Sequence, residues 1–414
     1  MPPKAPAPDL SRRTIAVLAV ALLAAAPAGA LRLACAGRAC RDAPAAARTP
    51  FCSLPEDTRK RIAAGFRDGR SPDVIGVTAD VAVGGPRARW PDTGGSPPAA
   101  LVSFGGARLR ARPANTTVAD VAPTIARLIG LDRPHPDVRS GRPIEAVRGG
   151  RPPRLVVLVL VRAPLRSPLP EDAIEASLGS LPVDDAAVAA TLGTGALPRE
   201  HGITGRVLRN DEGQTVPAWS PGAPASVVAA LGDHLDRAHG GRARIGMVSA
   251  RREDRGLIGG TWYPGPDDDD VRVVAPASVT RTAVRLAGSG YGRNATADLL
   301  AVALDGATPS DLARIERAAR RAARGRALVV TVWVPPAEGT GIPAARVARH
   351  VEGRLGPVVE EVAAGGLFVD SEAASEAGIT EQQVARTLRE MRIDGRPVFA
   401  DAFPGIAVEL GRYC

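Results

Sequence analysis

Short apolar runs and amphipathic stretches alternate along the chain from about residue 53 onward. The most apolar run spans residues 155–161, which are seven consecutive Leu and Val residues. Such an unbroken run is typical of a strand in a parallel sheet that is buried on both faces. Further strands are predicted at residues 73–79, 100–104, 244–248, 299–304, 327–334 and 367–369.

Helices are predicted between these runs, at residues 117–129, 186–192, 226–237, 310–324 and 381–391. Capping residues mark three helix starts: Ser53 with Glu56 for a helix running to about residue 66, Thr308 before Pro309, and Thr380 with Gln383. Residues 84–98 predict a loop and residues 142–153 a linker, because both are rich in Gly and Pro. The alternation of strands and helices predicts an α/β fold, a mostly parallel central sheet with helices on both faces.

Composition agrees with a folded protein whose core is built mainly from aliphatic residues. Of the 414 residues, 45% are hydrophobic, 23% are charged and 3% are aromatic. The net charge of +9 comes almost wholly from arginine, since Lys4 and Lys60 are the lysines of the chain. The arginines are dispersed and do not alternate with aromatic residues, so no nucleic-acid partner is predicted.

The N-terminus has the layout of a secretory signal peptide. Arg12 and Arg13 precede an apolar stretch at residues 14–26, and Ala28 and Ala30 form a small-residue cleavage site. We therefore predict a signal peptide at 1–30, of the twin-arginine type or the general secretory type, and a secreted or cell-envelope-associated protein. An uncleaved membrane anchor is the alternative. Residues 31–52 are predicted to be a flexible N-terminal segment.

Four cysteines lie outside the predicted signal peptide: Cys35, Cys40, Cys52 and Cys414. An even number of cysteines in an exported chain predicts disulfides, and four cysteines allow three pairings. No CxxC or His-rich spacing indicates a zinc site.

Two blocks carry a resemblance to a known family. The first, with Thr194-Gly195, Pro198 and His201-Gly202-Ile203, resembles the TG..P..HGI block of type I phosphodiesterases and nucleotide pyrophosphatases of the alkaline phosphatase superfamily. The second begins at Asp120-Val-Ala-Pro-Thr and resembles the block that closes such domains. Weaker matches lie at residues 155–161, 249–255 and 298–308, and residues 366–391 resemble a small cap region. The resemblance implies an alkaline-phosphatase-like fold.

The order of these blocks is not the order of the family. The tail-like part, residues 53–145, precedes the part that resembles the family's N-terminal half, residues 154–414. The resemblance thus implies one circularly permuted domain at 53–414, and a fusion of two partial domains is the alternative. Permutation would bring the new ends together, which implies a Cys52–Cys414 disulfide and a local Cys35–Cys40 pair.

The family's mechanism uses two metal ions and a hydroxyl nucleophile, and the resemblance implies that this chain has lost both. Arg162 follows the first strand where the family has an aspartate ligand, and Asp185 takes the place of the nucleophile. The other ligand positions align with residues 94–96, 307–308 and 330–334, which offer no equivalent carboxylate or histidine. No catalytic residue, metal or cofactor is therefore predicted.

Four residues are candidates for a remaining pocket: Asp185, His201, Arg206 and Arg255. His201 and Arg255 are more simply explained as a structural histidine and a solvated or paired arginine. A triad of Ser249, His234 and an acid is allowed by spacing alone. Residues 267–270 are four consecutive aspartates, for which a solvated loop is favoured over a calcium site.

The leading hypothesis is an exported, non-catalytic homologue of metal-dependent phosphodiesterases with a binding or scaffolding role. Two alternatives remain open: an extracytoplasmic hydrolase of phosphate or sulfate esters with a non-standard site, and a structural protein of the cell envelope. The candidate partners are an anionic small molecule or a cell-envelope component. Membrane contact is expected only through an uncleaved signal segment.

Overall fold

The computed structural model describes residues 50–79, 88–92, 99–163, 172–260, 262–263, 268–335, 342–411 and 414. Residues Thr49–Cys414 form one compact unit. The predicted signal peptide and the cysteines Cys35 and Cys40 lie outside the described residues. Among the helices that are described, none combines the length and the apolar character that a membrane span requires.

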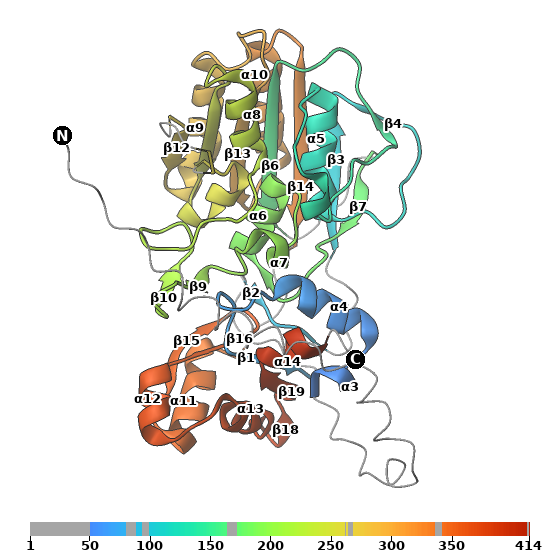
Figure 1. Cartoon of the computed structure of the whole chain (residues 1–414). Helices are drawn as coiled ribbons and strands as arrows, with labels where there is room; N and C mark the ends of the chain where they lie inside the picture. Colours follow the sequence, from blue (N-terminus) through green and yellow to red (C-terminus); the bar gives the residue numbers. More distant parts are fainter. Residues whose placement is uncertain are drawn as a thin grey trace, which may run out of the picture. The chain divides into compact units, whose positions relative to one another are not determined.

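A seven-stranded sheet forms the centre of this unit (Figure 1). Its strands, in spatial order, are β12 (Asp270–Val273), β11 (Ile245–Ser249), β13 (Asp298–Asp305), β6 (Leu155–Arg162), β14 (Ala327–Val334), β3 (Ala99–Gly105) and β7 (Ile174–Ser177). The first five strands are parallel, whereas β3 runs antiparallel to β14 and β7 antiparallel to β3. The predicted α/β class and the mostly parallel sheet are confirmed.

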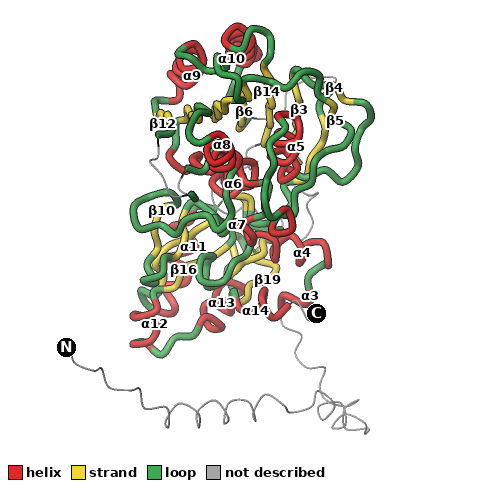
Figure 2. Tube along the Cα trace, turned by 45° about the horizontal axis from the view of Figure 1, so that its top comes forward, coloured by secondary structure: helices red, strands yellow, loops and turns green. Residues whose placement is uncertain are grey.

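Helices cover both faces of this sheet, because alternate side chains of β6 enter two different cores. Val156, Leu158 and Leu160 pack with α5 (Val121–Ile129), α6 (Asp185–Thr194) and α8 (Leu231–His239). Val157 and Val159 face the opposite core, with α9 (Val279–Gly288) and α10 (Pro309–Ala322). Figure 2 shows the strands between these two sets of helices.

A second, four-stranded antiparallel sheet joins the two ends of the described chain. Its order is β15 (Val359–Ala363), β16 (Gly366–Val369), β1 (Val74–Thr78) and β19 (Phe399–Pro404). Strand β1 therefore inserts between two strands that lie some 300 residues further along the sequence. Its core includes side chains from α11 (Ala344–Leu355), α12 (Ser371–Ala377) and α13 (Glu381–Arg389).

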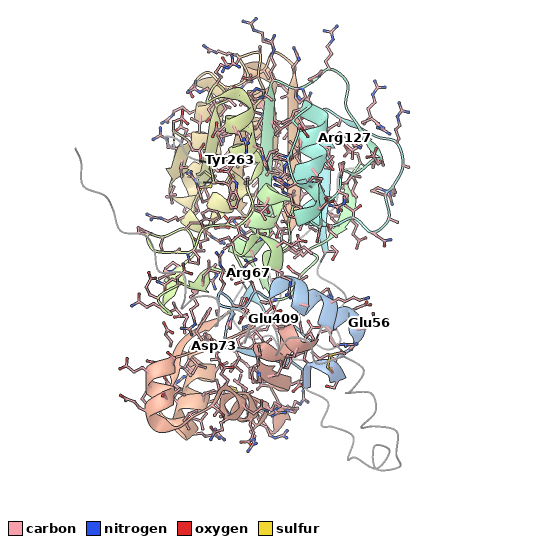
Figure 3. All side chains as sticks on the ribbon, in the orientation of Figure 1. Glu56, Arg67, Asp73, Arg127, Tyr263 and Glu409 are labelled. Carbon is pink, nitrogen blue, oxygen red and sulfur yellow. A yellow bond between two sulfur atoms is a disulfide. The ribbon has the colours of Figure 1, made fainter. Side chains whose placement is uncertain are left out.

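A disulfide between Cys52 and Cys414 joins the ends covalently, with 5.5 Å between the two Cα atoms (Figure 3). This is the pairing that the family resemblance implied. The neighbouring helices are α3 (Pro50–Ser53), α4 (Glu56–Gly65) and α14 (Ile406–Leu410). Phe51 packs edge-on against Phe403 beside them, with ring centroids 5.4 Å apart.

Charged contacts connect α7 and β9 to the segments around the four-stranded sheet. Arg199 of α7 (Pro198–His201) donates to both carboxylate oxygens of Glu409, at 2.9 and 2.8 Å. Arg209, at the end of β9 (Val207–Arg209), pairs with Asp73 at 2.5 Å and with Glu360 at 3.1 Å. Figure 3 labels Asp73 and Glu409.

The remaining elements are short. The strands are β2 (Ala88–Arg89), β4 (Arg108–Leu109), β5 (Val147–Arg148), β8 (Val183–Asp184), β10 (Thr215–Pro217), β17 (Arg392–Ile393) and β18 (Arg396–Pro397). The 3-10 helices are η2 (Val118–Asp120), η3 (Pro136–Val138), η4 (Arg252–Leu257) and η5 (Pro276–Ser278).

Two predicted helix starts are confirmed and two are wrong. Thr308 and Thr380 accept hydrogen bonds from the backbone of Asp311 and Gln383, as capping boxes do. Helix α4 begins at Glu56 with Pro55 as its N-cap, so Ser53 does not start it. The helix predicted from residue 226 begins at Leu231. The Ser226 hydroxyl donates to the carbonyl of Val228, which favours a turn over a helix start at this position.

Candidate functional site

The candidate site lies where three neighbouring strands of the main sheet end. Strand β6 ends in Arg162, β13 in Asp305 and β11 in Ser249, and the three strands are adjacent and parallel. Asp305 and Arg162 are direct partners in the strand register. Open α/β sheets bind ligands outside the carboxyl ends of their strands, so a functional site is expected at this edge.

Two further segments close this edge. Helix α6 begins at Asp185 and is buried along its whole length, and Asp184 is its N-cap, with Oδ1 accepting from the Ala186 nitrogen at 2.9 Å. The 3-10 helix η4, which carries Asp254, packs closely against α6. A Cβ on Gly256 would lie 2.6 Å from the nitrogen of Ala190, so glycine is required for this approach.

Six side chains from these segments form what we call the charge cluster: Arg162, Asp185, Ser249, Arg251, Asp254 and Asp305. Arg162 contacts all three carboxylates. Its Nε lies 3.2 Å from Asp185 Oδ1, its Nη1 lies 3.3 Å from Asp254 Oδ2 and 3.6 Å from Asp305 Oδ1, and its Nη2 donates to Asp254 Oδ1.

Arg251 completes the cluster from the other side. Its Nη1 donates to Asp185 Oδ2, and its Nη2 lies 2.7 Å from Asp305 Oδ2. Each of the six oxygens of the three carboxylates thus lies no farther than 3.6 Å from a guanidinium nitrogen. Ser249 adds a hydroxyl that donates to Asp254 Oδ2.

The cluster is buried and almost electrically balanced. The side chains of Arg162 and Asp254 are 7% and 0% exposed. A charged side chain is buried this deeply only when an opposite charge pairs with it. Burial by itself would lower the pKa of Arg162, but the carboxylates of Asp254 and Asp185 outweigh burial and raise its pKa. Arg162 is therefore a permanent cation among three anions.

This arrangement does not fit a two-metal centre. Divalent cations bind to carboxylate oxygens that have free lone pairs and little nearby positive charge. The carboxylates here already face guanidinium groups, and a dication placed among them would meet two positive charges. The Ser249 hydroxyl donates to a paired carboxylate, and none of the five histidines of the chain, all of which are described, contacts the cluster.

The four pocket residues expected from the sequence do not converge. Asp185 lies in the charge cluster, whereas Arg206 pairs with Asp184 at 3.2 Å. Arg255 donates from Nη2 to Asp269 at 2.7 Å and from Nε to the Gly259 carbonyl at 2.5 Å. Burial raises the pKa of Asp184 to about 6, although the nearby Arg206 opposes the shift.

His201 is completely buried and serves the packing of α7 on α6. Its Nδ1 accepts from the Ile203 nitrogen at 3.0 Å, so the proton is on Nε2, 3.1 Å from the Thr191 hydroxyl. Thr191 in turn donates to the Ala187 carbonyl at 2.9 Å. Burial first, and then the charges of Arg67 and Arg70, lower the pKa of His201 to about 3.

The spacing-based triad is not assembled. Ser249 contacts Asp254, whereas His234 lies between Arg139 Nη2 at 2.9 Å and the Tyr263 hydroxyl at 3.2 Å. Part of the aspartate run does gather, since ligand atoms of Asp236, Asp268 and Asp269 lie within 4.8 Å of one another. Asp267 lies outside the described residues.

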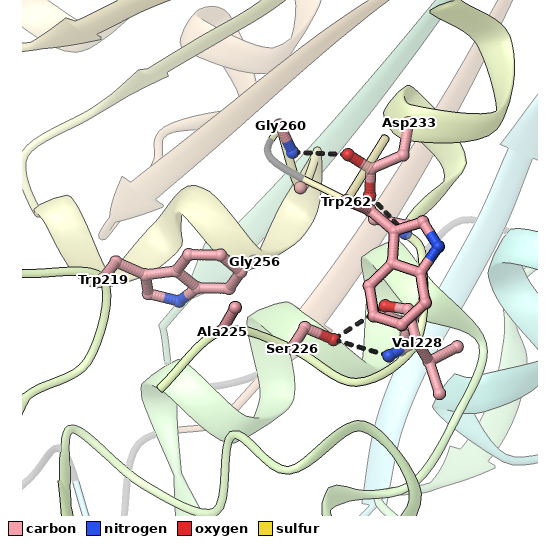
Figure 4. Close-up of a pocket in the computed structure, with 11 residues that line it drawn as sticks. Trp219, Ala225, Ser226, Val228, Asp233, Gly256, Gly260 and Trp262 are labelled. Atoms are coloured by element: carbon pink, nitrogen blue, oxygen red, sulfur yellow. Dashed lines mark hydrogen bonds between the residues drawn. The ribbon is translucent and has the colours of Figure 1, made fainter. Parts of the chain in front are cut away.

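A pocket lies at the opposite end of α6 from Asp185, and we call it the tryptophan pocket (Figure 4). Its lining includes Thr194, Trp219, Ser226, Val228, Asp233 and Trp262. Its cavity volume is about 20 Å³, which is room for about one water molecule, and it opens to solvent. At a rise of about 1.5 Å per residue, Thr194 is about 14 Å along the helix axis from Asp185.

Sequence reasoning noticed Arg162 only as a lost ligand and overlooked Arg251, Asp254 and Asp305. A usable signal was present for Asp305 and Ser249, because each follows directly on a predicted buried strand. Arg251 and Asp254 carry no such signal, because no local sequence pattern shows that their segment folds back onto the end of the sheet.

Comparison with protein-family models, with curated proteins and with solved structures found no match to this chain. The chemistry of the chain therefore has to be inferred from its own residues.

Proposed function

We propose that this chain is an exported, non-catalytic relative of the metal-dependent phosphodiesterases, and that it acts by binding or scaffolding. In this proposal the guanidinium groups of Arg162 and Arg251 neutralise the carboxylates that would otherwise hold metal ions. The four-stranded sheet with α11, α12 and α13 would correspond to the family's cap region. The circular permutation would account for β1 lying between β16 and β19.

One observation carries the proposal. The site at the carboxyl edge of the sheet holds three carboxylates, and every oxygen of these carboxylates faces an arginine nitrogen within 3.6 Å. Asp185, at the position of the family's nucleophile, has Arg162 on Oδ1 and Arg251 on Oδ2. A carboxylate held on both oxygens is a poor nucleophile, because attack would break two charge-assisted hydrogen bonds.

Export is supported by two features. The N-terminal residues have the layout of a signal peptide, and the chain forms a disulfide between Cys52 and Cys414. Structural disulfides persist in oxidising compartments and are rare in the cytosol.

The test is an activity assay on the oxidised chain from residue 31 to residue 414. Bis(p-nitrophenyl) phosphate, p-nitrophenyl phosphate and p-nitrophenyl sulfate are each incubated with the protein, with and without Zn²⁺, Mn²⁺ or Mg²⁺. We expect no release of nitrophenolate above the rate in buffer containing the same metal. The variant Asp185→Asn, and Asp211→Asn as a surface control, should be equally inactive.

Turnover of any of these esters by the purified chain would contradict the proposal. Turnover that Asp185→Asn abolishes and Asp211→Asn keeps would identify a working site of the family type. Turnover that neither variant changes would instead favour the ester hydrolase with a non-standard site.

A further inference from the structure

Five segments form the amino-terminal edge of the seven-stranded sheet, at the opposite end of its strands from the charge cluster. Four of them lead into the parallel strands β11, β13, β6 and β14, and the fifth follows the antiparallel strand β3. In that order they are residues 240–244, 289–297, 148–154, 323–326 and 106–112. Strand β6 has eight residues, so at about 3.3 Å per residue this edge lies about 23 Å from the charge cluster.

The five segments carry eleven arginines and no aspartate or glutamate. The arginines are Arg108, Arg110, Arg112, Arg148, Arg151, Arg154, Arg242, Arg244, Arg293, Arg324 and Arg326. The whole chain has 53 basic and 44 acidic residues, so eleven charged residues of average composition would include about five acidic ones. The arginine-rich composition alone therefore does not explain this edge.

Hydrogen bonds join neighbouring segments into one surface, which we call the arginine edge. Arg326 donates to the Pro152 carbonyl from Nε at 3.1 Å and from Nη2 at 2.5 Å. The Arg154 nitrogen donates to the Arg326 carbonyl at 2.8 Å. Arg244 Nη1 donates to the Ser289 carbonyl at 3.0 Å. The positive charges thus lie on one continuous surface, although they come from distant parts of the sequence.

The charges of this edge are exposed and poorly balanced. Arg108 and Arg148 are direct partners in the antiparallel pair of β4 and β5, where like charges repel and destabilise the pair. Nine of the eleven arginines are exposed. Among the described residues, Arg148 is the one of the eleven that has a carboxylate within 4.0 Å, Glu145 at 3.6 Å. The positive charge is therefore available to a partner outside the chain.

Helix ends account for only a small part of this charge. Helices α8, α9 and α10 end at this edge, and the carboxyl end of a helix carries about half a negative charge that a nearby arginine stabilises. Three such ends amount to about 1.5 negative charges, against eleven positive ones. Asp268, beside the outermost strand β12, adds one exposed carboxylate at the margin. Other acidic side chains at the margins pair with arginines outside the five segments: Glu145, Glu316, Asp269 and Asp270.

We propose that the arginine edge is a docking surface for a linear anionic polysaccharide. The arginines are spread over five segments and do not converge on one point, so they fit an extended partner whose negative charges repeat along its length. Each guanidinium can bind a carboxylate, sulfate or phosphate group through two parallel hydrogen bonds.

Two other extended polyanions fit this edge less well. Proteins that bind single-stranded nucleic acid stack bases on exposed aromatic rings, whereas the aromatic residue of the five segments, Tyr291, is 1% exposed. Proteins that lie on a membrane insert apolar side chains into it. The large apolar side chains that are exposed in the described ranges all lie outside the five segments: Val138, Trp262, Val273, Ile406 and Leu410. The choice of a polysaccharide also rests on the proposed export of the chain, but not on its proposed loss of catalysis.

Binding of fluorescently labelled heparin, a linear sulfated polysaccharide, tests the proposal. Anisotropy is measured with the oxidised chain from residue 31 to residue 414. We expect saturable binding in 50 mM NaCl that weakens about tenfold or more in 200 mM NaCl, because a polyanion releases bound counterions when arginines neutralise it. Neutral dextran should not bind.

A triple charge reversal locates the binding, and a second triple of equal net charge is the matched control. The edge variant combines Arg110→Glu, Arg151→Glu and Arg293→Glu, and the control combines Arg346→Glu, Arg386→Glu and Arg396→Glu, all at exposed positions. The edge variant should bind heparin about tenfold or more weakly than the unaltered chain, and the control should stay within about twofold. Circular dichroism checks folding, and glutamine replaces glutamate at the same positions if the edge variant does not fold.

Three results would overturn the proposal. One is no saturable heparin binding in 50 mM NaCl up to about 100 μM protein. Another is an equal loss of affinity in the edge variant and the control. The third is tighter binding of a DNA duplex, or of phosphatidylglycerol vesicles, than of heparin. Ester turnover is measured separately, so a chain that hydrolyses esters and binds heparin through this edge would contradict only the proposed loss of catalysis.

Discussion

The two ends of helix α6 lie in contrasting electrostatic surroundings. At its start, Asp185 sits in a cluster where three carboxylates meet two guanidinium groups. At its end, Thr194 borders a pocket backed by Arg133 and Arg139, for which no carboxylate is found within 4.0 Å in the described part of the chain. Arg139 is buried as Arg162 is, and Arg133 is half-buried, so the main difference between the two ends is the pairing of charge.

The two ends should therefore respond differently when one charge is removed. A buried charge that is fully paired has little left to offer a ligand, and removing one partner is strongly destabilising. A partly buried charge without a carboxylate partner costs stability in the folded protein, so its removal should cost less. Among the fully buried side-chain atoms of the charge cluster, Arg251 Nε has no hydrogen-bond partner in the described part of the chain.

The largest effect is expected for Arg162. Arg162→Met should lower the free energy of unfolding by about 3–5 kcal/mol, because it removes the guanidinium partner of Asp254 and leaves Asp185 and Asp305 with Arg251 alone. Urea denaturation monitored by circular dichroism measures the change. Mn²⁺ should raise the stability of this variant but not that of the unaltered chain, since the freed carboxylates can then bind a cation.

Two controls sharpen that result. Arg320→Met breaks an exposed pair with Glu316, in which the side chains are 45% and 42% exposed, and should cost no more than about 1 kcal/mol. Arg133→Met removes a half-buried cation that has no carboxylate within 4.0 Å among the described residues, and it should cost far less than Arg162→Met. Equal losses at Arg133 and Arg162 would break the comparison.

Acid should destabilise the pocket end of the helix. Burial first, and then Arg133 and Arg139, lower the pKa of His234 from 6.5 to about 3. The folded state therefore binds fewer protons than the unfolded state, so this contribution to stability is complete above pH 6.5 and is lost as the pH falls toward 3. The loss is at most about 5 kcal/mol, and less where solvent reaches the ring.

The measurement is the free energy of unfolding between pH 4 and pH 8 for the unaltered chain and for His234→Gln. The variant should have the shallower dependence on pH below 6.5. Parallel curves for the unaltered chain and His234→Gln would contradict the prediction.

At the cluster end the pH dependence should have the opposite sign. Asp184 is buried, and its pKa is raised from 3.8 to about 6, so the folded state binds its proton more tightly than the unfolded state. Above pH 6 the buried, charged carboxylate lowers the free energy of unfolding by about 3 kcal/mol. This loss vanishes as the pH falls below about 4.

Asp184→Asn keeps an oxygen to cap α6 and removes the charge. The variant should thus gain stability relative to the unaltered chain at pH 7, and the gain should disappear near pH 4. Asp211→Asn, at an exposed turn, serves as the control. The opposite result is a variant that is less stable than the unaltered chain at pH 7, with a smaller difference at pH 4. It would mean that the ion pair with Arg206 stabilises the Asp184 carboxylate by more than its burial costs.

The sequence was a good guide to the strands and a poor one to the site. The run 155–161 is apolar throughout, and the strand 327–334 is apolar except for Thr331. A strand of a parallel sheet that is covered on both faces has this pattern, so both strands were predicted within a residue of β6 and β14. Residues 279–288, 344–355 and 399–404 were missed because their short apolar patterns are mixed with charges. The contacts of Arg251 and Asp254 depend on how η4 folds back on α6, and no local pattern encodes that.

The smallest effect on stability is expected at the pocket mouth. Trp262 is 43% exposed, so Trp262→Ala should change the free energy of unfolding by no more than about 1 kcal/mol. Trp90, which is 2% exposed and packs against Phe399, should cost about 3–5 kcal/mol when replaced by alanine. Denaturation of both variants measures this contrast. If Trp262→Ala is as damaging as Trp90→Ala, the exposed indole contributes to the core rather than only to the wall of the tryptophan pocket.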